Sequence, residues 1–152
     1  MTSLEIARPA VLENLEFFIQ GLSRWLADGG MRPDCIKRVQ LAVEEALVNV
    51  FRYAYGKGSG MVLLRGRKTE DGLFLIEIID QGVPFDICTA PAPDLSCTIT
   101  DRKIGGLGVF FIKKMTDEIR YRREGDSNVL TLVVRDKDPG VTPFKDKMAQ
   151  AR

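Results

Sequence analysis

The chain has 152 residues, of which 45% are hydrophobic and 28% charged, a balance typical of a globular protein with one core. The formal net charge of +1 gives no basic excess for nucleic acid, and the absence of histidine excludes Ser-His-Asp and Cys-His catalysis. Three scattered cysteines argue against a zinc site and a disulfide framework. With no signal peptide and no membrane-length apolar run, the sequence predicts a cytoplasmic protein.

The N-terminal part predicts a short strand followed by a helix. Residues 2–8 alternate weakly, and Pro9 is expected to open the helix because a proline at the first helical position loses no hydrogen bond. Apolar residues recur at helical spacing from 11 to 26. Those predicted to enter the core are Leu15, Phe18, Leu22 and Trp25. The alternative for this stripe is a surface for a partner or a homodimer.

A second helix is predicted from about Ile36 to Tyr55, with Asp34 as its N-cap. The stripe expected to pack on a sheet consists of Ile36, Val39, Val43, Ala46, Val50 and Ala54. Glu45 and Asn49 are four residues apart and share another face, roughly opposite this stripe. Apolar residues flank the polar pair, which favours a cleft wall. The alternative is a solvated pair whose apolar neighbours are exposed by chance.

The C-terminal part predicts two hairpins separated by a long loop and a short helix. The expected elements are strands at 61–68 and 73–80, a helix at 107–119, and strands at 119–124 and 129–136. Residues 81–108 lack periodicity, which is typical of a functional or mobile loop. Within them, Asp94–Arg102 is predicted to be a mobile lid, with an ordered surface loop as the alternative.

This order of elements predicts the fold class. Hairpins with helices gathered beside them indicate an α/β (α+β) two-layer sandwich with a mostly antiparallel sheet and one helical layer. A single domain is expected over residues 1–135, followed by a C-terminal tail at 136–152.

An apolar strand ends abruptly at Asp80, within the sequence "IEIIDQGVPFD". A carboxylate fixed at the end of a rigid strand can accept a hydrogen bond from an exocyclic amine, and Gly82 would let a flat ring approach the backbone. The alternative is that Asp80 only caps a turn, as aspartate often does.

The last predicted helix begins with glycines, in the sequence "KIGGLGVFFIKKM". Gly105, Gly106 and Gly108 lie where free helix N–H groups can bind phosphate. The pattern is neither a P-loop nor a Rossmann fingerprint, and alone it is a weak signal. Combined with the Glu45–Asn49 face and Asp80, it predicts a magnesium–nucleotide site.

Three blocks carry a family resemblance: "LAVEEALVNVFRYAYG", "IIDQGVPFD" and "GGLGVFFIKKMTDEIRY". In this order they resemble the GHKL-type ATP-binding fold, and they look most like the bacterial anti-sigma-factor serine/threonine kinases that work with STAS-domain antagonists. The resemblance spans about residues 3 to 135. Tyr53 departs from the family pattern, which often has histidine at this position.

The resemblance implies roles for residues that bind Mg²⁺, contact the adenine ring or act as the general base. Glu45 matches the general base, and Asn49 matches the asparagine whose amide oxygen ligates Mg²⁺. Asp80 matches the acceptor for the adenine amino group, and Gly82 the glycine beside the ring. Thr131 resembles a threonine that assists adenine binding.

On the phosphate side, the resemblance implies that Gly105, Gly106 and Gly108 are the lid glycines that cover ATP or ADP. Arg102 or Lys103 is expected to neutralise charge on the transferred group.

The implied function is phosphorylation of a STAS-domain anti-sigma antagonist, with sequestration of a sigma factor when the antagonist is not bound. Two alternatives stay open. One is a nucleotide-gated module that traps a partner without kinase activity, and the other is ATP hydrolysis that drives lid closure.

Overall fold

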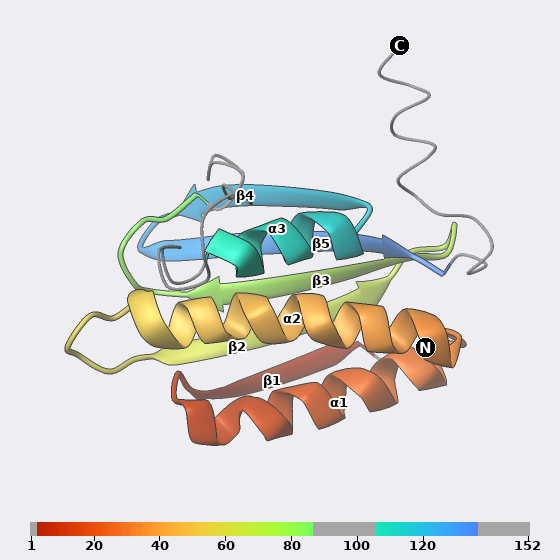
Figure 1. Ribbon diagram of the computed structural model, residues 1–152, viewed down its shortest axis with the longest axis horizontal. Helices are drawn as coiled ribbons and strands as arrows, with labels where there is room; N and C mark the ends of the chain where they lie inside the picture. Colours follow the sequence, from red (N-terminus) through yellow and green to blue (C-terminus); the bar gives the residue numbers. More distant parts are fainter. Residues whose placement is uncertain (1–2, 87–105, 137–152) are drawn as a thin grey trace, which may run out of the picture.

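The strands form one antiparallel sheet in the order β1-β2-β3-β5-β4, and the helices lie together on one of its faces (Figure 1). The computed structural model describes residues 3–86 and 106–136. Its elements are β1 (Leu4–Pro9), the 3-10 turn η1 (Leu12–Asn14), α1 (Leu15–Asp28), α2 (Pro33–Tyr53), β2 (Met61–Lys68), β3 (Leu73–Asp80), α3 (Gly106–Met115), β4 (Glu118–Glu124) and β5 (Ser127–Arg135). The two-layer sandwich predicted from the sequence is confirmed.

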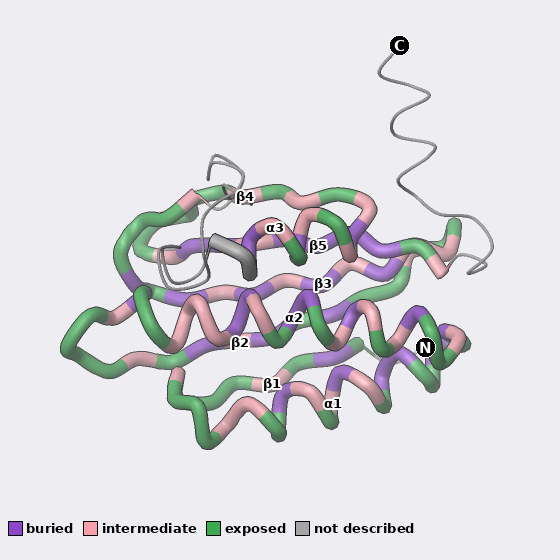
Figure 2. Tube along the Cα trace, viewed as in Figure 1, coloured by how far each residue is buried: buried purple, intermediate pink, exposed green. Residues whose placement is uncertain are grey.

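Alternation along β3 explains why the core lies on one side of the sheet. Every second residue of this strand, from Phe74 to Asp80, is buried, and the residues between them are partly exposed. The register places Val134, Leu132, Leu130 and Asn128 of β5 opposite these buried positions. Figure 2 shows the resulting buried positions along the central strands and on α2. The helix-facing side of the sheet is therefore apolar until its last pair, Asp80 and Asn128.

Helix α1 packs as its apolar stripe predicts. Phe18, Leu22 and Trp25 are buried, and Leu15 is a partly buried residue against the same core. The indole of Trp25 meets the ring of Phe74 edge-on, with centroids 5.6 Å apart. The core interpretation of this stripe is confirmed.

Two predicted boundaries are wrong. Pro9 does not open a helix; it is the last residue of β1, an edge strand where a missing N–H is tolerated, and α1 begins only at Leu15. The helix predicted to reach residue 119 ends at Met115, because residues from Glu118 onward pair with β5. Ile119 fits both helical and strand spacing, and the sheet hydrogen bonds decide between them.

The N-terminus of α2 is capped from a distant part of the chain. Asp34 lies in the first turn but is not the N-cap, which is Arg32, and Arg32 makes no capping bond through its own side chain. Instead, the Oδ1 atom of Asp136 accepts hydrogen bonds from the backbone N–H and the Nε–H of Arg32, both at 3.4 Å. A carboxylate at this end of a helix also interacts favourably with the helix dipole.

Several predicted features lie outside the described residues. They are the lid at 94–102, Arg102, Lys103, Gly105 and the tail from residue 137.

Candidate functional site

Three chain segments that carry predicted site residues meet at one end of the sandwich. The C-terminal end of α2, the C-terminal end of β3 and the first turn of α3 all lie at the left side of Figure 1. A backbone hydrogen bond from the N–H of Val83 to the carbonyl of Ala54, 2.8 Å long, joins the exit of β3 to the end of α2. Helix α3 packs beside α2. The fold thus gathers three segments that are 26 or more positions apart from one to the next in the sequence.

Asp80 lies at this meeting point and is almost fully buried, with 6% of its surface exposed. Its Oδ1 atom accepts hydrogen bonds from the N–H of Gly82 and from Nδ2 of Asn128, both at 2.9 Å. Among the described residues, its Oδ2 atom has no hydrogen-bond partner. Asp80 therefore caps a turn through one oxygen, while the other oxygen is left for a donor from a ligand.

Gly82 is required by close packing against α2. A Cβ atom at this position would lie 2.1 Å from the carbonyl oxygen of Ala54, which is far inside van der Waals contact. The glycine thereby allows the turn after β3 to press against the helix end. Its predicted place beside a nucleotide ring stays a prediction.

Tyr55 fixes the same turn from the side of α2. Its hydroxyl accepts a hydrogen bond from the N–H of Gln81 at 2.8 Å and donates one to the carbonyl of Met61. Burial raises the pKa of Tyr55, the bond from Gln81 lowers it, and the nearby Asp80 carboxylate raises it, with a net upward shift. The hydroxyl therefore keeps its proton at neutral pH and holds the loop before β2 to the exit of β3.

Glu45 and Asn49 lie on the side of α2 that faces α3. Each residue of a helix turns by about 100°. Phe51 marks the side facing α1, because its ring centroid lies 6.3 Å from that of Phe18. Glu45 and Asn49 lie on the other side, and α2 lies between α1 and α3 (Figure 1). The structure thus places the pair on the α3 side.

This polar pair borders the core rather than lying opposite it, which corrects the sequence interpretation. Ala42 and Ala46, on neighbouring turns, are buried, so the apolar stripe is wider than expected. The side-chain Nδ2 of Asn49 is buried and has no hydrogen-bond partner in the described part of the chain. Glu45 is half-buried and forms no hydrogen bond or ion pair with any described residue. Buried polar groups are usually hydrogen-bonded, so the amide of Asn49 is open to a water molecule or a polar ligand.

Helix α3 begins at Gly106, and Gly108 lies in its first turn. The first N–H groups of a helix have no partner within the helix, so this end can bind an anion. Its position beside α2 places these N–H groups at the same end of the molecule as Asp80 (Figure 1).

Thr131 is not brought to this site. The register pairs it with Glu77 of β3, which puts its side chain on the face of the sheet that the helices leave open. Asn128, three residues earlier, lies opposite Asp80 and bonds to it. Sequence reasoning missed Asn128, although counting back by twos from the inward-facing Leu130 reaches it.

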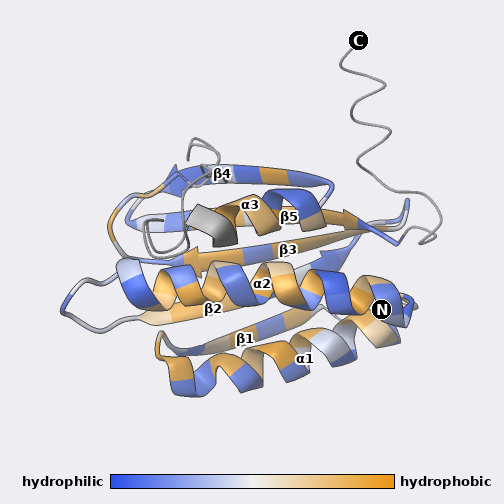
Figure 3. Ribbon diagram, viewed as in Figure 1, coloured by the Kyte–Doolittle hydropathy of each residue, from blue (hydrophilic) through white to orange (hydrophobic). Residues whose placement is uncertain are grey.

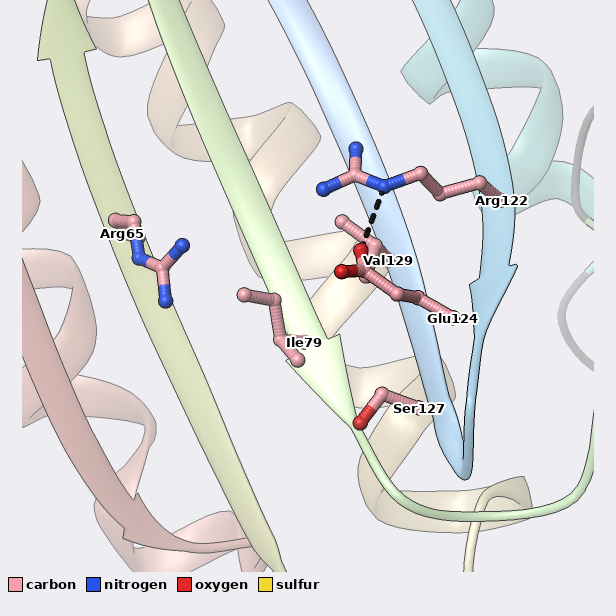
Figure 4. A pocket seen from close by; sticks show the side chains of 6 residues that line it. All are labelled: Arg65, Ile79, Arg122, Glu124, Ser127 and Val129. Atoms are coloured by element: carbon pink, nitrogen blue, oxygen red, sulfur yellow. Dashed lines mark hydrogen bonds and ion pairs between the residues drawn. The ribbon is translucent and has the colours of Figure 1, made fainter.

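A pocket of about 230 Å³ lies on that open face, away from the helices (Figure 4). Its lining residues are Arg65, Ile79, Arg122, Glu124, Ser127 and Val129. Arg122 pairs with Glu124 at 3.0 Å and with Glu77 at 3.3 Å, so its charge is already balanced. The helices cover the other face of the sheet, and Figure 3 shows the hydrophobic and hydrophilic positions along α2 on that side. The pocket is thus separate from the site at Asp80.

The described residues include no group of three or more His, Cys, Asp or Glu side chains that could hold a metal ion. In this part of the chain, a hard cation would therefore take most of its oxygen ligands from a bound molecule, with an amide such as that of Asn49 as a protein ligand.

No helix in the described ranges is long and apolar enough to span a membrane.

The fold and the site define the class of protein. The family described as histidine kinase-like ATPase domain matches residues 8–142, and the chain belongs to this family.

Curated relatives narrow this class to one kind of kinase. The chain is 29% identical over 135 residues to the serine-protein kinase RsbW of Listeria monocytogenes, covering 85% of each chain. It is 27% identical over 139 residues to RsbW of Staphylococcus aureus, covering 87% of each. It is also 34% identical over 111 residues to RsbW of Halalkalibacterium halodurans, covering 70% of this chain and 65% of that one.

Solved structures agree on the fold. A structure of the RsbU and RsbW domains of Rv1364c from Mycobacterium tuberculosis matches 91% of this chain with a TM-score of 0.66 at 18% identity. The match covers 34% of that longer chain. A blue-light activated histidine kinase from Erythrobacter litoralis matches 72% of this chain, with a TM-score of 0.53.

Proposed function

We propose that this protein is an ATP-dependent serine/threonine protein kinase that acts as an anti-sigma regulatory factor. The observation that carries the proposal is the pair Glu45 and Asn49, which have no partners among the described residues although they border the core. Their position beside α3, in a chain whose curated relatives are serine-protein kinases, supports a nucleotide as the missing partner.

The residues present fit a bound ATP. The free Oδ2 atom of Asp80 would accept from the adenine amino group, and the first N–H groups of α3, with Gly106 and Gly108, would face the phosphates. The buried Nδ2 of Asn49 lacks a partner and would donate to a phosphate oxygen, while the amide oxygen of the same side chain would ligate Mg²⁺. Bound Mg²⁺ would supply neutralisation of phosphate charge.

Glu45 then acts as the general base. Its carboxylate accepts the proton of a serine or threonine hydroxyl on the substrate protein, and the hydroxyl oxygen forms a bond to the γ-phosphorus. The bond between that phosphorus and the bridging oxygen breaks, and ADP leaves. Arg102 or Lys103 and Gly105 would add charge and N–H groups on the phosphate side.

The substrate that we propose is a STAS-domain anti-sigma antagonist. When the antagonist is phosphorylated and released, the protein would bind and sequester a sigma factor in the cytoplasm. The names of the curated relatives support the kinase part of this scheme, and the partner exchange rests on the family resemblance.

The direct test mixes the protein with labelled ATP, Mg²⁺ and STAS-domain proteins from the same genome. We expect label on a serine or threonine of one of them. ATP binding without transfer to any of them would contradict the kinase, and failure to bind ATP at all would overturn the nucleotide site itself.

A non-catalytic module that traps a partner in response to nucleotide makes a different prediction. In that case Glu45→Gln would leave partner control intact, whereas Asn49→Ala and Asp80→Asn would abolish it. In a kinase, all three substitutions abolish the capture of the sigma factor that follows phosphorylation of the antagonist.

A further inference from the structure

Asn128 makes four hydrogen bonds at the end of β5, and each of them ends on the exit of β3 or on β4. Its Nδ2 donates to Oδ1 of Asp80 at 2.9 Å and to the carbonyl of Val83 at 2.8 Å. Its Oδ1 accepts from the hydroxyl of Tyr121 at 2.6 Å and from the N–H of Phe85 at 3.4 Å. The side chain is buried, with 6% of its surface exposed. All hydrogen-bonding capacity of this amide is therefore used.

These partners fix the direction of the amide. The N–H of Phe85 is only a donor, so it requires the amide oxygen, and the carbonyl of Val83 is only an acceptor, so it requires the amide nitrogen. A flipped amide would lose both bonds, and the hydroxyl of Tyr121 can follow either orientation. Asn128 therefore presents a donor, and only a donor, to Asp80.

This donor determines what Asp80 can recognise. Two donors, Nδ2 of Asn128 and the N–H of Gly82, occupy the same oxygen of Asp80. Both groups donate to the carboxylate, so its other oxygen stays available as an acceptor. The remaining oxygen then favours a ligand with an amino group. A carbonyl in the same place would set two acceptors against each other.

We propose that Asn128 is the positioning residue that makes this site select a 6-amino purine over a 6-oxo purine. It acts through Asp80, and it also ties the segment from Val83 to Phe85 to the sheet at the edge of the site. The inference rests on the proposed function, because it assumes that the purine ring of the nucleotide meets Asp80. Adenine presents an amino group at this ring position, where 6-oxo purines present a carbonyl oxygen.

The test compares ATP with inosine triphosphate, whose ring has a carbonyl in place of the amino group and a proton on the neighbouring nitrogen, N1. Binding of both, with Mg²⁺, is measured by calorimetry for the full chain and for Asn128→Asp. The substitution sets a second carboxylate against Asp80, so one of the two must take up a proton and become a donor. We expect the preference for ATP to fall by about tenfold or more, as for a lost hydrogen bond to a charged group.

Thr131→Val is the matched control. It lies on the same strand, is equally buried at 7% exposure, and points to the opposite face of the sheet. It should keep the wild-type ratio of the two affinities. Tyr121→Phe, which removes only one bond to the Asn128 oxygen, gives a second variant that leaves the buried amide in place, and its preference should fall by a smaller factor.

The outcomes separate the two levels of the proposal. A purely structural role of Asn128 would weaken both nucleotides equally, and an unchanged ratio in whichever variant stays folded overturns the inference. If the wild-type chain binds neither nucleotide, the proposed function itself is contradicted, and the inference that rests on it falls with it. If the wild-type chain binds ATP and inosine triphosphate equally well, the function stands and the inference fails.

Discussion

The two sides of the candidate nucleotide site differ in how far their polar groups are already satisfied. Around Asp80, the turn after β3 is held by Tyr55, by the end of α2 and by Asn128, through hydrogen bonds of 2.8 to 2.9 Å. On α2, the Nδ2 atom of Asn49 is buried without a partner, and Glu45 has no partner among the described residues. Among the described residues, the Asp80 side has all of these bonds made and leaves Oδ2 of Asp80 open, whereas the polar groups of the α2 side have none.

The difference indicates that the two sides of the site contribute to nucleotide binding in different ways. Groups whose bonds are already made do not need to be ordered when a ligand binds, so the Asp80 side can recognise a base at little entropic cost. A buried amide without a partner costs free energy until something bonds to it. The α2 side therefore gains most from binding, and this gain falls where phosphates and Mg²⁺ are proposed to lie.

The largest effect is expected from Glu45→Gln, which tests the α2 side. The substitution keeps the size of the side chain but removes the proton acceptor, so phosphoryl transfer should fall by on the order of 10²–10⁴-fold. ATP affinity, measured by calorimetry, should change little, because Glu45 is proposed to act on the substrate hydroxyl. An equal loss of binding and transfer would instead mean that Glu45 holds the nucleotide.

Asp80→Asn tests the other side of the comparison. Asparagine has one amide oxygen, which accepts, and one amide nitrogen, which only donates, so the variant should lose either the bond from Asn128 or the bond to the ligand. We expect ATP affinity to fall by about 10- to 150-fold, the equivalent of about 1.5–3 kcal/mol for a hydrogen bond to a charged group. Thermal unfolding of the free protein is the control. Unchanged ATP affinity in a folded Asp80→Asn protein would remove the base-recognition role.

Gly82→Ala tests whether the turn around Asp80 depends on its close packing against the end of α2. The new methyl group would overlap the carbonyl of Ala54, so the free energy of unfolding should fall by about 1–3 kcal/mol. Gly58→Ala is the control. Its new Cβ atom would lie 3.3 Å from the nearest atom, the carbonyl oxygen of Tyr55, so a small shift relieves the contact. Denaturant unfolding measures both variants, and equal stability of the two would show that the turn yields at no cost.

The sequence could predict most of the fold because its strands and helices have clear periodicity. It could not predict the ends of elements where two patterns overlap. Ile119 suits the end of a helix and the start of a strand, and only pairing with β5 decides between them. The cap of α2 was also out of reach, since its carboxylate comes from Asp136, 104 residues away from Arg32.

The candidate site was predictable in the same uneven way. Glu45 and Asn49 are one helical turn apart, and Asp80 ends an apolar strand, so local spacing singles them out. Asn128 depends on the register between β3 and β5, and that register is a long-range property. Thr131 lies three positions further along β5, an odd number, so its side chain is on the opposite face of the strand from Asn128.

The smallest effect is expected at the far end of α2, where Asp136→Ala would remove the cap. Burial raises the pKa of Asp136, but hydrogen bonds from Cys35 and Arg32 and the charge of Arg32 lower it further, so the net shift is downward. A lowered pKa in the folded state means stability that is present above the unfolded pKa, near 3.9, and is lost as pH falls through the folded value.

Asp136→Ala should therefore lower the free energy of unfolding by about 1 kcal/mol at pH 7, as for loss of a helix cap. The difference in this free energy between the variant and the wild type should become smaller below about pH 4. Asp126→Ala, in the exposed β4–β5 turn, has no such cap to lose and should change the free energy of unfolding little at pH 7. Denaturant unfolding at pH 7 and pH 3 measures both variants. Since α2 carries Glu45 and Asn49, a loss of ATP affinity in Asp136→Ala would show that the open side of the site depends on this distant cap. Unchanged affinity would show that the fixed contacts at Ala54 and Tyr55 hold that end of the helix alone.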